Sequence, residues 1–219
     1  MKQSIFNFDS GSGVFFTSDT HFGHESIINL CNRPFSSVKE MDQALIDNWN
    51  SVVGPNDYVF HLGDFCFKGT QYWDNILNQL NGHKFLILGN HDLKNLNAGP
   101  MLKFDWVGFQ AYIQIGNRSI FLNHFPFLCY GGSYRNPENV IYALHGHTHL
   151  NKNNFNGRDI PRLDMCFSSQ LDVGVDAHNF TPIPWERVDI LIKEQIEHKQ
   201  NQLQTFEKYL KYAENNEAL

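Results

Sequence analysis

The chain has 219 residues, of which 42% are hydrophobic, and a formal net charge of −6 at pH 7. This length supports one sizeable hydrophobic core, so we expect one domain rather than two. The negative balance argues against a protein that grips long nucleic acid, because such proteins carry a basic surface. No apolar run approaches membrane-spanning length, and the opening stretch MKQSIFNFDSGSG lacks the apolar segment of a secretion signal. We therefore expect a cytoplasmic protein with no membrane partner.

The sulfur and imidazole side chains differ in their distribution. The four cysteines, Cys31, Cys66, Cys129 and Cys166, are widely spaced and form no CxxC pair. In a chain without a secretion signal, this spacing predicts reduced thiols rather than disulfides or zinc ligands. The eleven histidines are the unusual feature, because several of them occur in tight local groups.

Strand-like and helix-like segments alternate along the first half of the chain. Apolar or alternating runs typical of β-strands occupy residues 14–17, 58–62, 84–88, 112–115, 119–122 and 140–144. The segment SVKEMDQALIDNWNSVV begins with Ser37 and Glu40 in the spacing of a capping box, which predicts a helix, and a second helix is expected near residues 71–80. This alternation predicts an α/β layered fold with parallel strands. Gly116 and Asn117 predict a tight hairpin, so the sheet is mixed or there are two packed sheets.

The C-terminal segment is charged and has a helical pattern. Its apolar stripe includes Ile192, Ile196, Leu203, Phe206 and Leu210. We therefore divide the chain into a domain of residues 1–189 and an amphipathic helix of residues 190–219. This helix either packs on the domain or self-associates as a short coiled coil, so the protein is a monomer or a homodimer.

Side chains that bind metal ions follow five of the strand-like runs. In chain order these are Asp19 and His21, then Asp64, then Asn90, His91 and Asp92, then His124, then His147 and His149. A single histidine at the end of a strand is commonly structural. Strand ends gather at one edge of an α/β sheet, however, and five such groups together predict a shared metal site there.

These motifs, in this order, resemble those of the calcineurin-like metallophosphoesterase superfamily: D-x-H, G-D, G-N-H-[D/E], a lone His and G-H-x-H. The resemblance extends over residues 14–176. The strings SDTHFGH, CNRPFSSVKEMD and LDVGVDAHNFTPI look like those of a small bacterial and phage branch. The resemblance implies a layered α/β fold of mixed β-sheets flanked by helices, with the metal site at the strand ends.

The resemblance also implies a ligand set for two divalent metal ions. Asp64 bridges the ions; Asp19, His21 and His149 complete one site, and Asn90, His124 and His147 complete the other. Nitrogen and oxygen ligands without thiolate suit Mn²⁺ best in this interpretation, with Fe, Zn²⁺ and Ni²⁺ as alternatives.

The implied function is that of a binuclear metal-dependent phosphoesterase acting on a small phosphorylated substrate, a phosphodiester or a nucleotide. A hydroxide held between the ions attacks phosphorus, and His91, oriented by Asp92, protonates the leaving group. A nuclease of the same superfamily and a noncatalytic scaffold are the alternatives. Because every ligand position is filled, the sequence favours an enzyme over the scaffold.

Contacts to the substrate are harder to identify from the sequence. Arg33 and Arg135 lie in loops near the motifs and are candidates for binding a phosphate through charge-assisted hydrogen bonds. Tyr130 and Tyr134 are candidates for stacking on a base. His24 either contacts the substrate or begins a helix, while His61 and His145 precede the motif glycines and are expected to be structural.

Overall fold

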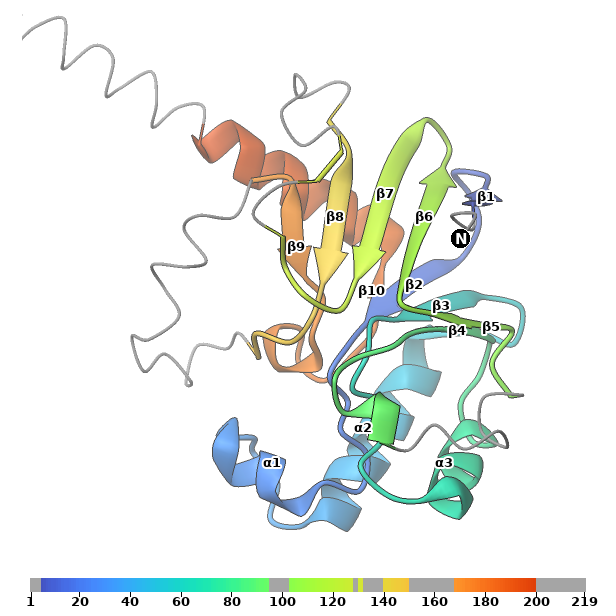
Figure 1. The fold of residues 1–219 in the computed structure, drawn as a ribbon, viewed down its shortest axis with the longest axis vertical. Coiled ribbons are helices and arrows are strands. Elements are labelled where there is room, and N and C mark those ends of the chain that lie inside the picture. The colour runs from blue at the N-terminus through green and yellow to red at the C-terminus, as the bar shows by residue number, and fades with distance from the viewer. Residues whose placement is uncertain (1–4, 95–102, 128–129, 132–139, 150–167, 200–219) are drawn as a thin grey trace, which may run out of the picture.

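The computed structural model describes residues 5–94, 103–127, 130–131, 140–149 and 168–199. Within them the chain forms two five-stranded sheets flanked by helices (Figure 1). The strand order is β10-β2-β3-β4-β5 in one sheet and β1-β6-β7-β8-β9 in the other. This arrangement confirms the predicted α/β class with mixed sheets.

The first sheet is parallel apart from one edge strand. Its strands are β2 (Val14–Thr17), β3 (Tyr58–His61), β4 (His83–Ile87), β5 (Trp106–Gly108) and the antiparallel β10 (Ile183–Pro184). The helices that connect them are α1 (Glu25–Leu30), α2 (Val38–Val52) and α3 (Thr70–Leu77), followed by the short η1 (Asp92–Lys94). The Ser37 side chain accepts a hydrogen bond from the Glu40 backbone N–H at the start of α2, as the capping pattern predicts.

The second sheet is built around a hairpin. It contains β1 (Ile5–Phe8), β6 (Gln110–Ile115), β7 (Arg118–Asn123), β8 (Tyr142–His145) and β9 (Gln170–Asp172). β6 and β7 pair antiparallel, and Gly116 takes a positive φ of 55° between them, which confirms the predicted hairpin. β7, β8 and β9 are parallel, and the short η2 (Val175–Ala177) follows β9.

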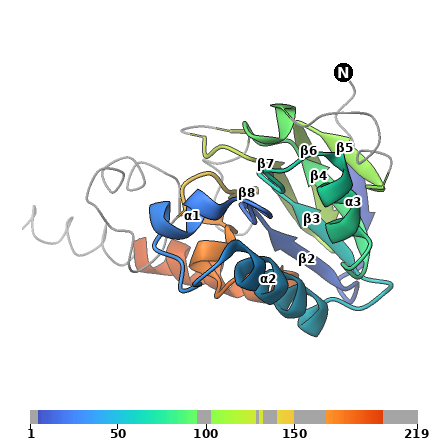
Figure 2. The same cartoon turned by 90° about the horizontal axis from the view of Figure 1, so that it is seen from below.

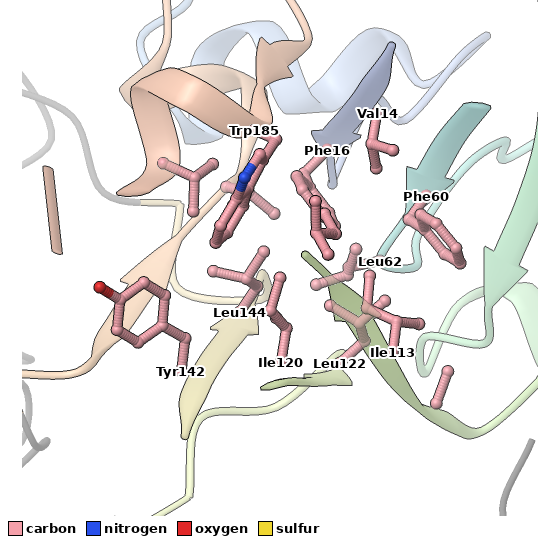
Figure 3. Packing of buried hydrophobic residues seen from close by; sticks show 14 of the residues in the cluster. Val14, Phe16, Phe60, Leu62, Ile113, Ile120, Leu122, Tyr142, Leu144 and Trp185 are labelled. Atoms are coloured by element: carbon pink, nitrogen blue, oxygen red, sulfur yellow. The ribbon is translucent and has the colours of Figure 1, made fainter. Parts of the chain in front are cut away.

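Two apolar layers hold these elements together. Between the sheets, Phe16 and Phe60 face Leu122 and Leu144 across the core shown in Figure 3. On the other face of the first sheet, α2 and α3 cover the parallel strands (Figure 2), and side chains such as Trp49 are buried there. Alternate residues of each central strand therefore enter different layers, as the period of two along a strand requires.

The described part of the C-terminal segment is helical over residues 185–199 and packs on the domain. Val188 and Ile192 are fully buried in the core between the sheets, and Trp185 lies beside them. The Tyr142 hydroxyl donates a hydrogen bond to Asp189 Oδ1 at 3.0 Å. The helix thus begins before residue 190 and shares the domain's core, while Leu203, Phe206 and Leu210 lie outside the described residues. No described helix combines the length and apolar character needed to cross a membrane.

Candidate metal centre

The predicted ligands follow the carboxyl ends of parallel strands from both sheets. Main-chain contacts join these ends across the gap between the sheets. Ser18, after β2, forms a bridge with Gly174, after β9, and the Val175 N–H donates to the Ser18 carbonyl oxygen at 3.0 Å. The ligands of the two sheets are therefore brought to one place, as the sequence predicts for strand ends.

Asp19, His21 and His149 form what we call the first cluster. Their ligand atoms all lie within 4.8 Å of one another. Asp19 Oδ1 and His21 Nε2 are buried and have no hydrogen-bond partner among the described residues. Buried polar atoms without partners carry a cost in free energy, which a bound cation at this position removes.

Asn90, His124 and His147 form the second cluster, which lies beside Asp64. The ligand atoms of His124, His147 and Asp64 lie within 4.8 Å of one another. His124 Nδ1 faces the Leu62 carbonyl oxygen at 2.7 Å, so this nitrogen carries the proton and Nε2 carries the lone pair. Nε2 also lies 3.0 Å from Asn90 Oδ1, which is another lone-pair atom. A shared cation accounts for two acceptors at this distance.

Asp64 lies between the two clusters. Its Oδ2 is 3.7 Å from His21 Nε2 in the first cluster and 3.6 Å from His124 Nε2 in the second. These separations are too long for hydrogen bonds. They suit atoms that share an ion, because two ligand atoms at about 2.1 Å from the same ion lie at most about 4.2 Å apart.

Asp19 and Asp64 each use one carboxylate oxygen for a hydrogen bond to the backbone and leave the other without such a bond in the part of the chain that the structure describes. Asp19 Oδ2 accepts a hydrogen bond from the His147 backbone N–H, and Asp64 Oδ1 accepts one from the His91 backbone N–H, both at 2.9 Å. The other oxygen of each carboxylate faces the ligand clusters. One oxygen therefore fixes the loop of another motif while the second remains available to a cation.

The backbone at these positions is in an uncommon conformation. Five of the seven predicted ligands have a positive φ between 49° and 69°, namely Asp19, His21, Asp64, His147 and His149. For residues other than glycine this region is sparsely populated, and such conformations cluster at functional sites. The close approach of the loops also explains Gly146, because a Cβ there would lie 1.9 Å from Ser18 Oγ and 2.3 Å from Asp19 Oδ2.

The electrostatics of the site also fit a divalent cation. Burial raises the pKa of Asp19 to about 6, with His149 opposing part of that rise. Burial lowers the pKa of His21 well below its usual value and lowers that of His147. Both shifts favour neutral imidazoles, whose lone pairs are available to a cation. His149 differs, because burial, which lowers its pKa, is outweighed by its hydrogen bond to Asp176 and by neighbouring groups that include Asp19, and the pKa of His149 rises to about 11. Imidazole nitrogens with carboxylate and amide oxygens suit a first-row divalent ion, so the residues present fit the implied metal pair.

His91 lies at the open side of the site. Its side chain is 34% exposed, and its Nε2 lies 3.9 Å from Asp64 Oδ2. The ring centroid is 4.6 Å from that of Phe67, an aromatic side chain that the sequence analysis does not single out. His91 is therefore placed where a proton donor can reach a substrate held by the clusters.

Asp92 has a different role from the predicted one. It is fully buried, and its carboxylate accepts backbone N–H groups from Asp64, Phe65 and Gly89 at 2.8 to 2.9 Å. His91 Nδ1 has no hydrogen-bond partner within the described residues. The structure thus contradicts the prediction that Asp92 orients the His91 ring, because the carboxylate instead ties together the loops after β3 and β4.

Arg33 also differs from its prediction as a substrate contact. Its side chain has 0% exposure, and its guanidinium donates to both oxygens of Asp176 and to the carbonyl oxygens of Asp19 and Thr20. A weaker contact reaches the Met41 sulfur at 3.5 Å. The five N–H groups of a guanidinium are thereby used inside the protein. The structure therefore contradicts a phosphate contact for Arg33.

The other candidates for substrate binding fall into three groups. His24 begins α1 without capping it, lies 3.1 Å from His21 through the two Nδ1 atoms and stacks on Phe67, so it faces the site. Tyr130 is buried with its hydroxyl bonded to Ser169, which does not fit stacking on a base. Arg135 and Tyr134 lie outside the described residues.

Two residues that hold the metal-ligand loops in place were not predicted from the sequence. Asp176 accepts a hydrogen bond from His149 Nδ1 at 2.8 Å. Asp42 accepts the Gly23 backbone N–H at 3.0 and 3.1 Å, and so holds the loop that connects His21 to α1. Both carboxylates belong to strings quoted for the family resemblance, and that membership is the only sequence signal that marks them. His61 and His145 are buried in β3 and β8, as predicted for structural residues.

Comparisons with known proteins agree with this geometry. A family profile for calcineurin-like phosphoesterases matches residues 13–210. The chain is 32% identical over 182 residues to the uncharacterized protein MJ1445 of Methanocaldococcus jannaschii, covering 82% of this chain and 89% of that protein. It is also 30% identical over 195 residues to the Gene 66 protein of Mycobacterium phage D29, covering 78% of this chain and 92% of the phage protein.

A solved structure shows the same architecture. The protein of unknown function AQ665 from Aquifex aeolicus superposes with a TM-score of 0.62 at 28% sequence identity, covering 83% of this chain and 100% of that one. The family profile spans every described strand except β1 and includes all the residues of the two clusters. The chain belongs to the calcineurin-like phosphoesterase family.

Proposed function

We propose that this protein is a metal-dependent phosphoester hydrolase that uses two divalent cations and acts on a small phosphodiester or nucleotide. The observation that carries the proposal is the position of Asp64, whose Oδ2 lies 3.6 to 3.7 Å from nitrogen ligands of both clusters. A carboxylate suits a bridge between cations, because it has two oxygens rich in lone pairs and one negative charge.

The chain's own residues hold the cations in this proposal. The first cluster takes one cation, the second cluster takes the other, and Asp64 contacts both. Mn²⁺ is the proposed ion for activity, since the donors are imidazole, carboxylate and amide. When bound, the two cations supply Lewis-acid polarisation of the phosphoryl oxygens and lower the pKa of water.

His91 acts as the general acid. Its exposed imidazole lies beside Asp64 and the open side of the clusters, so it can hold a proton at Nε2 and donate it to the leaving oxygen. Phe67 packs beside this ring, with the two ring centroids 4.6 Å apart.

The charge of the chain and an aromatic side chain beside the second cluster support the proposal of a small substrate. Phe125 is 43% exposed, and its ring lies 4.9 Å from that of His124 and 4.7 Å from that of His147. The Phe125 ring is thus available to an organic group of the substrate, while the net charge of −6 favours a compact phosphoester over a long nucleic acid.

The test is an assay of reconstituted protein. The protein is stripped of metal, supplied with Mn²⁺ and assayed on bis-p-nitrophenyl phosphate, p-nitrophenyl phosphate and 2′,3′-cyclic nucleotides. We expect metal-dependent turnover, with diesters hydrolysed better than monoesters and no turnover by Asp64→Asn. A protein that binds two ions yet hydrolyses none of these esters would count against the proposal.

A further inference from the structure

A buried ion pair lies behind the first cluster and joins segments that are far apart in the sequence. Arg33 and Asp176 are separated by 143 residues, and both side chains have 0% exposure. The Arg33 Nε donates to Asp176 Oδ1 at 2.8 Å, and Nη2 donates to Oδ2 at 2.9 Å. This is the bidentate geometry in which a guanidinium and a carboxylate fix each other's orientation.

The same guanidinium also holds the loop after β2. Its Nη2 donates to the Asp19 carbonyl oxygen at 2.7 Å, and its Nη1 donates to the Thr20 carbonyl oxygen at 3.0 Å. These carbonyl groups lie in the loop that carries Asp19 and His21. The two metal-binding side chains of that loop are therefore fixed from behind by one arginine.

Asp176 connects this arginine to the remaining residue of the cluster. Its Oδ2 lies 2.8 Å from His149 Nδ1, and His149 Nε2 lies 3.8 Å from Asp19 Oδ1. A carboxylate at this position keeps a proton on Nδ1, so Nε2, the nitrogen that faces Asp19, is the one that can bind a cation.

We propose that Arg33 and Asp176 are positioning residues that organise the first cluster for its metal ion: Arg33 through the carbonyl groups beside Asp19, and Asp176 through His149. This inference rests on the proposed function, since it assumes that the clusters hold cations. Burying a guanidinium and a carboxylate has a cost in free energy, so the pair is best explained by what it organises.

The second cluster differs from the first in its support. His124 Nδ1 is held by a neutral main-chain carbonyl group, that of Leu62, rather than by a carboxylate. Partners that orient a ligating histidine typically change metal affinity by about 10- to 100-fold. We therefore expect the ion pair to affect the affinity of the first cluster and to leave that of the second almost unchanged.

The experiment is a calorimetric titration of the metal-free protein with Mn²⁺. The test variants are Arg33→Lys, which keeps the charge but loses the bidentate contact, and Asp176→Asn, which keeps the shape but loses the charge. Matched controls are Arg118→Lys, at an arginine that bonds the Val140 carbonyl oxygen, and Asp189→Asn, on the C-terminal helix. We expect each test variant to weaken one of two binding steps by about 10- to 100-fold, and each control to bind both ions like the wild type.

The outcomes separate this inference from the proposed function. A wild-type protein that binds no divalent ion would overturn both. If both test variants bind two ions with the same dissociation constants as the wild type, the ion pair does not position the cluster, while the proposed function stands. Equal weakening of both steps would also contradict the inference, because it indicates general damage.

If a variant does not fold, a measurement on the wild type tests whether Asp176 orients His149. Nitrogen-15 NMR of the Zn²⁺-loaded protein reports which nitrogen of His149 carries the proton. We expect a protonated Nδ1 and a metal-bound Nε2. Metal bound at Nδ1 would overturn the inference, because Asp176 would then not be the partner of that nitrogen.

Discussion

The two clusters of the metal centre are supported in different ways. In the first cluster, Asp19 and His21 are buried and an ion pair stands behind them. In the second cluster, His147 is exposed and His124 is held by a backbone carbonyl group. From this difference we expect the first cluster to hold its ion more tightly than the second. Asp64 lies between the two clusters and, in the proposed function, joins them into one centre.

Removing the shared residue has the largest expected effect. Asp64→Asn removes the negative charge that both ions share, so we expect loss of both ions and a fall in turnover of about 10⁴-fold or more, because the metal chemistry is lost. Elemental analysis and the diester assay measure the two effects. Asp105→Asn changes an exposed carboxylate that pairs with His83 and is the matched control. Two ions bound tightly by Asp64→Asn would contradict its bridging position.

His91→Ala tests the proposed general acid, which lies beside Asp64. We expect both ions to remain bound and turnover to fall by about 10²- to 10⁴-fold for esters with poor leaving groups. The loss should be smaller for p-nitrophenyl esters, because their leaving group does not need a proton. His83→Ala, at an exposed histidine, is the control. An unchanged rate on alkyl esters would exclude His91 as the general acid.

A chelator sharpens the comparison between the clusters. When Mn²⁺-loaded protein is mixed with excess chelator, we expect two phases of ion release, with the faster at least about 10-fold faster, the size typical of outer hydrogen-bond partners. His147→Ala should abolish the fast phase and keep the slow one. Release of both ions in a single phase would show that the clusters are equally supported.

His61 tests a support behind the loops of both Asp19 and Asp64. Its Nε2 bonds Thr20 Oγ1 and its Nδ1 accepts the Gly63 N–H, so the ring is held neutral. Burial, with a smaller contribution from His124, lowers the pKa of His61 to about 3. Between that pKa and the usual value of 6.5 the unfolded chain binds the extra proton. The stability from this residue is complete above pH 6.5 and is lost as the pH falls toward 3.

The variant His61→Gln removes this titration. In metal-free protein, we expect the free energy of unfolding of the wild type to decrease relative to that of the variant by up to about 1.4 kcal/mol per pH unit below pH 6. Urea unfolding at several pH values measures the difference. Parallel pH profiles for the two proteins would show that His61 is not held neutral.

Local patterns in the sequence were enough to predict the central strands and the ligand loops. The segments of β2, β3 and β4 are mostly apolar and are followed closely by Gly, Asp, Asn or His. The same local pattern therefore predicts both the strand and the metal ligands that follow it. The short strands β5, β9 and β10 carry no such pattern, because two or three residues are too few to show a period. The four residues of β1 carry none either, because Asn7 interrupts their apolar run. These strands form because neighbouring strands, distant in the sequence, offer them hydrogen-bond partners.

The supporting contacts could not be predicted because they are not local. Arg33 stands in a loop between α1 and α2, where a substrate contact and a structural one have the same sequence appearance. Its partner Asp176 is 143 residues away. Asp92 was misassigned for a related reason: its neighbour His91 suggests a side-chain contact, whereas its carboxylate turns toward the backbone of Asp64, Phe65 and Gly89.

Electron paramagnetic resonance of the Mn²⁺-loaded protein tests the position of Asp64 between two ions most directly. With two equivalents of Mn²⁺ per chain, we expect the spectrum of a spin-coupled pair, and Asp64→Asn should lose it. A spectrum of isolated ions at full occupancy, with elemental analysis confirming two Mn²⁺ per chain, would contradict a shared binuclear centre.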